Sequence, residues 1–124
     1  MGTLNTFFFD TYAFFEIIAG NPNYLPYKRC SIITTKLNLM ELHHGLLTIY
    51  GKDKADRYYD KLVVFALEIE DEIYKQASDL KALHKKRRLS YVDCIGYTLA
   101  QRQGVKFLTG DIQFKDFANV EFVK

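Results

Sequence analysis

Four acidic side chains have surroundings that set them apart from the other carboxylates of the sequence. They are Asp10, Glu41, Asp93 and Asp111. Asp10 directly follows an aromatic run, and Glu41 is the single acid between Glu16 and Asp53. If the four converged in a partly dry cleft, mutual repulsion would raise their pKa values unless cations neutralised them. Because carboxylate oxygens without His or Cys favour hard ions, the set predicts a Mg²⁺ or Mn²⁺ site.

Such a site suits the hydrolysis of phosphodiester bonds. Divalent ions held by carboxylates lower the pKa of a bound water, orient it in line with the phosphorus and stabilise charge on the leaving oxygen. A nucleophilic side chain is then not needed. We therefore expect metal-activated water to do the chemistry, provided that the four acids meet around a shared ion.

Each acid also has a purely structural interpretation. Asp10 could cap a helix, Glu41 could be a solvated helix position, and Asp111 could belong to a turn. Asp93 follows Ser90 by three residues, which is the capping-box spacing at a helix start. These interpretations stay open for each acid taken singly. Together they do not explain why acids occur at two strand ends and in two helices that would flank those ends.

The elements that must position the acids alternate between strands and helices. Short apolar runs predict strands over 4–9, 30–34, 105–109 and 120–123, with a further short strand over 67–69. Apolar residues at helical spacing predict helices over 11–19, 36–50, 53–65, 70–86 and 90–103. This alternation predicts an α/β fold with a mainly parallel sheet covered on both faces. Ligands bind at the carboxyl ends of such strands, where Asp10 and Asp111 would lie.

Length and composition fit one ordinary globular domain. The chain has 124 residues, of which 48% are hydrophobic and 26% charged, so we expect a single domain over 1–124. Its apolar runs are too short to span a bilayer and its start lacks a secretory signal, which predicts a cytoplasmic protein without membrane association. Cys30 and Cys94 lack metal-ligand spacing and are expected as reduced, buried thiols. The net charge of +2 does not by itself argue for nucleic acid.

The order and context of the four acids resemble those of the PIN-domain nucleases, particularly the VapC-like toxin ribonucleases of type II toxin-antitoxin pairs. The matching segments are Phe9-Asp10-Thr11, Leu39-Met40-Glu41-Leu42, Leu89-Ser90-Tyr91-Val92-Asp93, and Phe107-Leu108-Thr109-Gly110-Asp111 with Phe114. Each segment is short, but the four occur in the family's order and span nearly the whole chain.

The resemblance implies both a fold and an activity. The fold would be a PIN-like three-layer α/β/α sandwich with a mainly parallel central sheet. The activity would be endonucleolytic cleavage of RNA with Mg²⁺ or Mn²⁺ as cofactor. The resemblance also implies a homodimer and a cognate antitoxin protein that inhibits the enzyme.

Carried over by position, the resemblance assigns roles to individual residues. Asp10, Glu41, Asp93 and Asp111 would form the catalytic acidic set, with Asp10 and Asp93 as direct metal ligands and the other two as further candidates. Thr109 would orient Asp111 or a metal-bound water, and Thr11 would act in the same way beside Asp10. Many relatives carry a further acid where this chain has Gln113. This departure puts a second metal ion in doubt, unless Asp116 reaches the site instead.

The densest basic run lies just before the helix that carries Asp93. It consists of Lys85, Lys86, Arg87 and Arg88. The run fits a solvated helix end, where cations favour the helix dipole, and it also suits contacts to RNA phosphates. His43 and His44 follow Glu41 closely, but metal-activated water would already supply the nucleophile. We therefore expect these histidines to be core or surface residues.

Three other classes of protein compete with the nuclease interpretation. A phosphatase with an aspartate nucleophile after the first strand needs a second Asp two residues later, where this chain has Tyr12. A receiver domain needs paired acids after that strand and a late lysine at a strand end, and this sequence has neither. A non-catalytic PIN-like domain that binds RNA or a protein partner stays open, although all four acids are intact.

Overall fold

Four parallel strands form the central sheet of the computed structural model, which describes residues 5–124. They are β1 (Thr6–Phe9), β2 (Ser31–Ile33), β3 (Lys106–Thr109) and β4 (Val120–Phe122). Their order across the sheet is β2-β1-β3-β4, and every neighbouring pair is parallel. The register places Phe8 beside Ile33 on one side and beside Phe107 on the other. The prediction of a parallel α/β sheet is confirmed.

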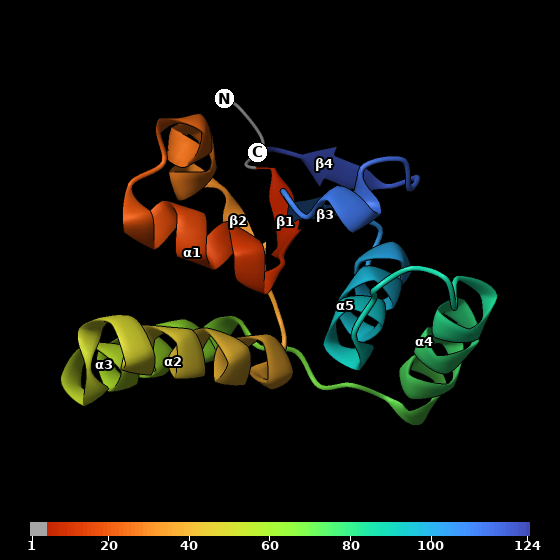
Figure 1. The fold of residues 1–124 in the computed structure, drawn as a ribbon, viewed down its shortest axis with the longest axis horizontal. Coiled ribbons are helices and arrows are strands. Elements are labelled where there is room, and N and C mark those ends of the chain that lie inside the picture. The colour runs from red at the N-terminus through yellow and green to blue at the C-terminus, as the bar shows by residue number, and fades with distance from the viewer. Residues whose placement is uncertain (1–4) are drawn as a thin grey trace.

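Helices cover both faces of the sheet (Figure 1). On one face lie α1 (Thr11–Ala19), α2 (Lys36–Tyr50) and α3 (Lys52–Leu62), and on the other α4 (Asp71–Leu83) and α5 (Tyr91–Arg102). The side chains of β1 alternate between these layers, because successive strand residues point to opposite faces. Phe8 joins the core beneath α4 and α5, whereas Phe7 and Phe9 join the core beneath α1 and α2. The expected three-layer sandwich is therefore present.

Some element boundaries differ from those predicted. The helix expected over 53–65 ends at Leu62 and continues as the 3-10 turn η2 (Val63–Phe65). The helix expected over 70–86 ends at Leu83, and residues 84–86 form a turn. The strand expected over 4–9 is β1, which begins at Thr6. Residue 4 lies outside the described residues.

The strand expected over 67–69 is wrong. The chain there crosses from one face of the sheet to the other, and Leu67 and Ile69 pack against the core beneath α4 and α5. Alternate burial along such an extended connection imitates the pattern of a strand. The residue just before this segment, Ala66, forms an isolated parallel β-bridge with Thr34.

The parallel topology brings the carboxyl ends of the strands to one edge of the sheet. α1 begins there with Asp10 as its N-cap, and α2 begins there with Thr35 as its N-cap. After β3, Asp111 caps the short 3-10 helix η3 (Ile112–Phe114). Figure 1 shows the first turns of α1, α2 and α5 near this edge. The fold therefore gathers the starts of three helices where the acids lie.

Two further expectations concern membranes and cysteines. Within residues 5–124, no helix is both long and apolar enough to cross a membrane. Cys94 is buried, as expected, and Cys30 is only partly buried at the end of the 3-10 segment η1 (Pro22–Arg29). Both side chains are free thiols.

Candidate active site

Asp10 is a buried carboxylate with only 4% of its surface exposed. Its Oδ1 accepts a hydrogen bond from the backbone N–H of Thr11 (2.8 Å), and its Oδ2 accepts one from the Thr109 hydroxyl (2.7 Å). Burial, followed by the negative charge of Asp93, raises the pKa of Asp10 to about 7. In the metal-free protein, Asp10 is therefore partly protonated at neutral pH.

Glu41 on α2 is held by a chain of hydrogen bonds that begins at the start of the same helix. The Thr35 hydroxyl donates to Oδ1 of Asn38 (2.7 Å), and Nδ2 of Asn38 donates to the Thr11 hydroxyl (3.1 Å). The Thr11 hydroxyl in turn donates to Oε1 of Glu41 (2.8 Å). Thr11 therefore contacts two acids, Asp10 through its backbone N–H and Glu41 through its side chain.

Asp93 is the third residue of α5 and forms a reciprocal capping box with Ser90. The Asp93 N–H donates to Oγ of Ser90 (3.0 Å), and Oδ2 of Asp93 accepts from the Ser90 N–H (2.9 Å). Burial raises the pKa of Asp93, and the charges of Asp111 and Glu41 act in the same direction. One turn along, Gly96 lets the rings of Phe8 and Phe107 pack directly against the helix. This contact fixes α5 against the sheet.

Thr109 connects Asp10 to Asp111. Its fully buried hydroxyl donates to Asp10 and accepts from the backbone N–H of Asp111 (3.1 Å). Oδ1 of Asp111 accepts from the backbone N–H of Gln113 (3.0 Å), so that Asp111 caps η3. The single residue between Thr109 and Asp111 is Gly110. A side chain at Gly110 would overlap the ring of Tyr12 and the carbonyl oxygen of Val123.

The four acids share one electrostatic neighbourhood. The charges of Asp93 and Glu41 both raise the pKa of Asp10, and those of Asp111 and Glu41 raise the pKa of Asp93. A divalent cation would offset both this repulsion and the burial of Asp10. The donors are carboxylate and hydroxyl oxygens, which Mg²⁺ and Mn²⁺ select. In charge and donor chemistry, the residues fit such an ion.

The acids do not surround a single point as the structure stands. Across residues 5–124, no three His, Cys, Asp or Glu side chains are arranged as a group that could hold a metal ion. Each of the four carboxylates instead accepts a hydrogen bond from a nearby backbone N–H or hydroxyl. A carboxylate oxygen bonded in this way keeps a further lone pair. An ion could bind through these remaining lone pairs only if the four carboxylates turned toward one point.

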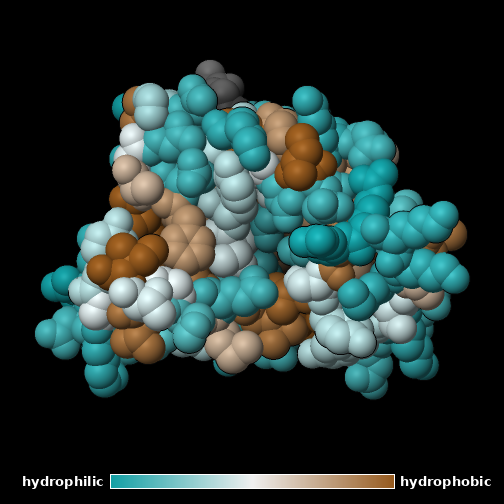
Figure 2. All heavy atoms as spheres, in the orientation of Figure 1, coloured by the Kyte–Doolittle hydropathy of each residue, from teal (hydrophilic) through white to brown (hydrophobic). Residues whose placement is uncertain are grey.

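A cavity of about 580 Å³ opens beside Glu41. It is lined by Thr11, Phe15, Met40, Glu41, His44 and Gly45. In the view of Figure 2, apolar surface gathers on the side of α1 and α2, whereas the side of α4 is mostly hydrophilic. The cavity gives a ligand access to Thr11 and Glu41 from the α1–α2 side of the molecule.

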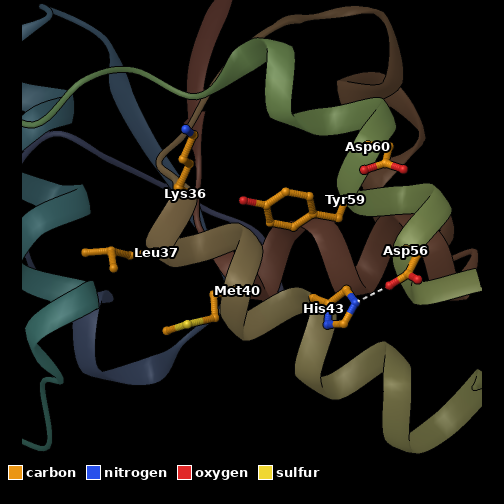
Figure 3. A pocket seen from close by; sticks show the side chains of 7 residues that line it. All are labelled: Lys36, Leu37, Met40, His43, Asp56, Tyr59 and Asp60. Atoms are coloured by element: carbon orange, nitrogen blue, oxygen red, sulfur yellow. Dashed lines mark hydrogen bonds and ion pairs between the residues drawn. The ribbon is translucent and has the colours of Figure 1, made fainter. Parts of the chain in front are cut away.

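A second cavity, of about 420 Å³, lies between α2 and α3 (Figure 3). His43 points toward Asp56 there, with 2.7 Å between its Nε2 and Oδ1 of Asp56. The imidazole also meets the ring of Tyr59 edge-on. His43 is thus engaged with α3, and His44 is an exposed residue at the rim of the cavity beside Glu41.

Asp116, the further candidate ligand, is paired with Arg87. Its two oxygens each accept a hydrogen bond from Arg87 at 2.9 Å, and this pairing lowers the pKa of Asp116. The rest of the basic run is different, since Lys85, Lys86 and Arg88 are exposed and Arg87 is half-buried. Three of the four basic residues are therefore accessible to a phosphate backbone, and Arg87 is engaged inside the protein.

Asn38 and Thr35 are residues of this site that sequence reasoning missed. Both side chains are fully buried, although they are polar. Asn38 stands on the same helix as the buried residues Leu39 and Leu42, and Thr35 precedes it by the three residues of an N-cap spacing. A polar residue at that distance from a capping threonine was the available signal. It could not show that Asn38 reaches across to Thr11.

Comparisons with known proteins place this fold. The family model for the PIN domain matches residues 7–120. A comparison with curated protein sequences finds no match. Among solved structures, VapC20 of Mycobacterium tuberculosis, described as a sarcin-ricin loop cleaving toxin, is 19% identical with a TM-score of 0.78, and 95% of this chain and 99% of that chain are covered.

Two other solved structures are similarly close in fold. A toxin-antitoxin complex from Klebsiella pneumoniae is 17% identical with a TM-score of 0.73, covering 93% of this chain and 95% of that chain. VapBC2 from Rickettsia felis, bound to a DNA fragment from its promoter, is 16% identical with a TM-score of 0.71, covering 96% and 99%. At these low identities, the TM-scores over nearly the whole of each chain show a common fold. The family model, which matches residues 7–120, shows that this chain belongs to the PIN domain family.

Proposed function

We propose that this protein is a Mg²⁺- or Mn²⁺-dependent endoribonuclease that acts as the toxin of a toxin-antitoxin pair. The observation that carries the proposal is the buried carboxylate of Asp10, whose pKa is raised to about 7 by burial and then by the charge of Asp93. A carboxylate buried among like charges is costly for a fold unless a cation offsets the repulsion. Membership of the PIN domain family supports the same function.

The chain's own residues prepare the site before a substrate arrives. A divalent cation held by Asp10 and Asp93, with Glu41 and Asp111 as further candidates, would supply a water nucleophile and stabilise the leaving oxygen of a phosphodiester. The Thr109 hydroxyl fixes Oδ2 of Asp10, and the Thr11 hydroxyl fixes Oε1 of Glu41. Such supporting bonds set the direction in which a carboxylate presents its remaining lone pairs.

RNA is the substrate in this proposal, and the accessible Lys85 and Lys86 are its phosphate contacts. The solved relatives supply the analogy. VapC20 is described as cleaving the sarcin-ricin loop, and the Klebsiella pneumoniae structure as a toxin-antitoxin complex. The proposal accordingly includes a homodimer, inhibition by a cognate antitoxin, a single domain over 1–124 and a cytoplasmic location.

An RNA cleavage assay tests the proposal. Wild-type protein is expected to cut a structured RNA internally when Mg²⁺ or Mn²⁺ is present and to stop in excess EDTA. Asp10→Asn and Asp93→Asn should each lower the rate by roughly a hundredfold or more, because each removes a charged oxygen donor. Asp79→Asn is the matched control, since it removes an exposed acid from α4 and should keep the rate.

Two results would overturn parts of this proposal. Cleavage that survives excess EDTA would exclude a metal-dependent mechanism. Wild-type protein that binds RNA with either metal present but leaves it intact would favour the alternative, a non-catalytic PIN-like domain that binds RNA or a protein partner.

A further inference from the structure

Arg87 is the member of the basic run whose side chain turns back onto the protein. Its guanidinium donates two parallel hydrogen bonds to the carboxylate of Asp116, both at 2.9 Å. Nη1 also donates to the backbone carbonyl of Gln113 at 2.7 Å. The guanidinium lies over the ring of Phe117, 4.8 Å from its centroid. One side chain therefore contacts three residues of the segment 113–117.

These contacts join the connection before α5, which leads to Asp93, to residues 113–117, which follow Asp111. Arg87 lies in the connection between α4 and α5, three residues before the capping residue Ser90. Gln113 is the second residue of η3, the 3-10 helix that Asp111 caps. The carbonyl of Gln113 accepts from Arg87 while its N–H donates to Oδ1 of Asp111. Gln113 is therefore hydrogen-bonded to both Arg87 and the carboxylate of Asp111.

We propose that Arg87 is a positioning residue, which fixes the segment carrying Asp111 against the segment that leads into α5 and Asp93. Its significance for cation binding rests on the function proposed above, whereas the contact between the two segments does not. The backbone N–H of Arg88 donates to Oε1 of Gln113 at 3.4 Å and adds a further link between the segments. Gln113 therefore contributes to this link through both its backbone and its side chain.

The contacts of Arg87 differ from those expected of a residue that binds RNA phosphates. Its charge already faces Asp116, and its side chain is 32% exposed. An exposed ion pair is worth little by itself, and the carboxylate of Asp116 is 68% exposed. The positioning effect therefore comes mainly from the bond to the Gln113 carbonyl and the contact with Phe117. A planar guanidinium can make these contacts together with the paired bonds to Asp116, and a lysine ammonium cannot.

Amide hydrogen exchange in metal-free protein tests the contact without any assumption about activity. In Arg87→Ala and in Arg87→Lys, exchange over residues 111–114 should accelerate about tenfold, because a charge-assisted hydrogen bond to this segment is lost. Exchange in β1 and α1 should stay unchanged, which excludes general unfolding. Asp116→Asn should have a smaller effect, since the bond to the Gln113 carbonyl remains. Lys86→Ala, the matched removal of a neighbouring charge, should leave exchange over residues 111–114 unaltered.

Mn²⁺ titration of the same variants then tests the consequence for the site. Arg87→Ala and Arg87→Lys should weaken Mn²⁺ affinity about tenfold, while metal-free RNA affinity and its salt dependence stay as in wild type. Unchanged exchange over residues 111–114 in Arg87→Ala would overturn the positioning role. If RNA affinity instead falls and its salt dependence decreases by about one charge, Arg87 is a phosphate contact. If wild-type protein binds no Mn²⁺, the proposed function fails, and the exchange result still decides whether Arg87 holds the Asp111 segment.

Discussion

Asp10 and Asp111 cap α1 and η3, and Asp93 completes the capping box of α5, each with the carboxylate that is proposed to bind a cation. The two roles are compatible, because one hydrogen bond to a backbone N–H leaves lone pairs on both oxygens. In the metal-free protein, capping also holds each side chain in one orientation, from which it would turn toward a bound ion. The N-termini of α1 and α5 carry partial positive charge, which lowers the cost of placing acids there. At these positions, helix capping and the proposed cation binding can therefore be served by the same carboxylates.

Asp10 gives the stability of the metal-free protein a defined pH dependence. Its pKa is about 7 in the fold against 3.8 for the ordinary side chain, so the folded state holds this proton more tightly than the unfolded chain does. The contribution of Asp10 to stability is therefore complete below about pH 4 and is lost as the pH rises through about 7. In EDTA, Asp10→Asn should gain stability relative to wild type between about pH 5 and pH 8, by about 2–4 kcal/mol.

Urea unfolding of both proteins across this pH range measures the effect. Asp79→Asn serves as the control, because its exposed carboxylate should give a difference from wild type that does not change with pH. A difference between Asp10→Asn and wild type that stays constant from about pH 5 to pH 8 would contradict the burial of a titrating Asp10.

At the scale of elements, the site depends on how closely β3 and its continuation approach α1 and the chain end. Gly110 allows this approach, since its backbone lies against the ring of Tyr12 and the carbonyl of Val123. The backbone carbonyl cannot move away as a flexible side chain would. The turn between Thr109 and Asp111 is therefore set by packing between elements as well as by the hydrogen bonds of Thr109.

Gly110→Ala should destabilise the fold by about 1–3 kcal/mol through overpacking, and it should also displace Asp111. The Mn²⁺-induced rise in Tm is then expected to shrink. Gly104→Ala is the control: Gly104 has a φ of 69° and open space around it, so alanine there strains the backbone far from the acids. Thermal unfolding with and without Mn²⁺ compares the two. An equal Mn²⁺ effect in both variants would show that Gly110 matters for stability alone.

At the scale of the whole molecule, local patterns in the sequence predict the order of strands and helices well. The aromatic run before Asp10 and the apolar spacing of α2 are features of neighbouring residues, and both elements are present. The sequence predicted that this helix extends to residue 86, whereas α4 ends at Leu83, because the basic residues that follow are as compatible with a helix as with a turn. Residues 67–69 were predicted as a strand because Leu67 and Ile69 are apolar and alternate with a polar residue, although the segment only crosses between the two layers.

The connections across the site could not be read from the sequence. Asn38 reaches Thr11 over 27 positions, and Arg87 reaches Asp116 over 29. Such contacts depend on the packing of whole elements, which spacing along the chain does not encode. The same limit applies to the acids: their positions at strand ends and helix starts were predictable, whereas the hydrogen bonds that turn each carboxylate were not.

The proposed function depends on the uptake of a divalent cation by the acids at the sheet edge. Anomalous diffraction from crystals of the wild-type protein grown with Mn²⁺ would locate such an ion. We expect a Mn²⁺ peak about 2.1 Å from carboxylate oxygens of Asp10 and Asp93, with Glu41 or Asp111 turned toward it. Crystals in which Mn²⁺ occupies other sites, while Asp10 and Asp93 keep the orientations described above, would contradict it.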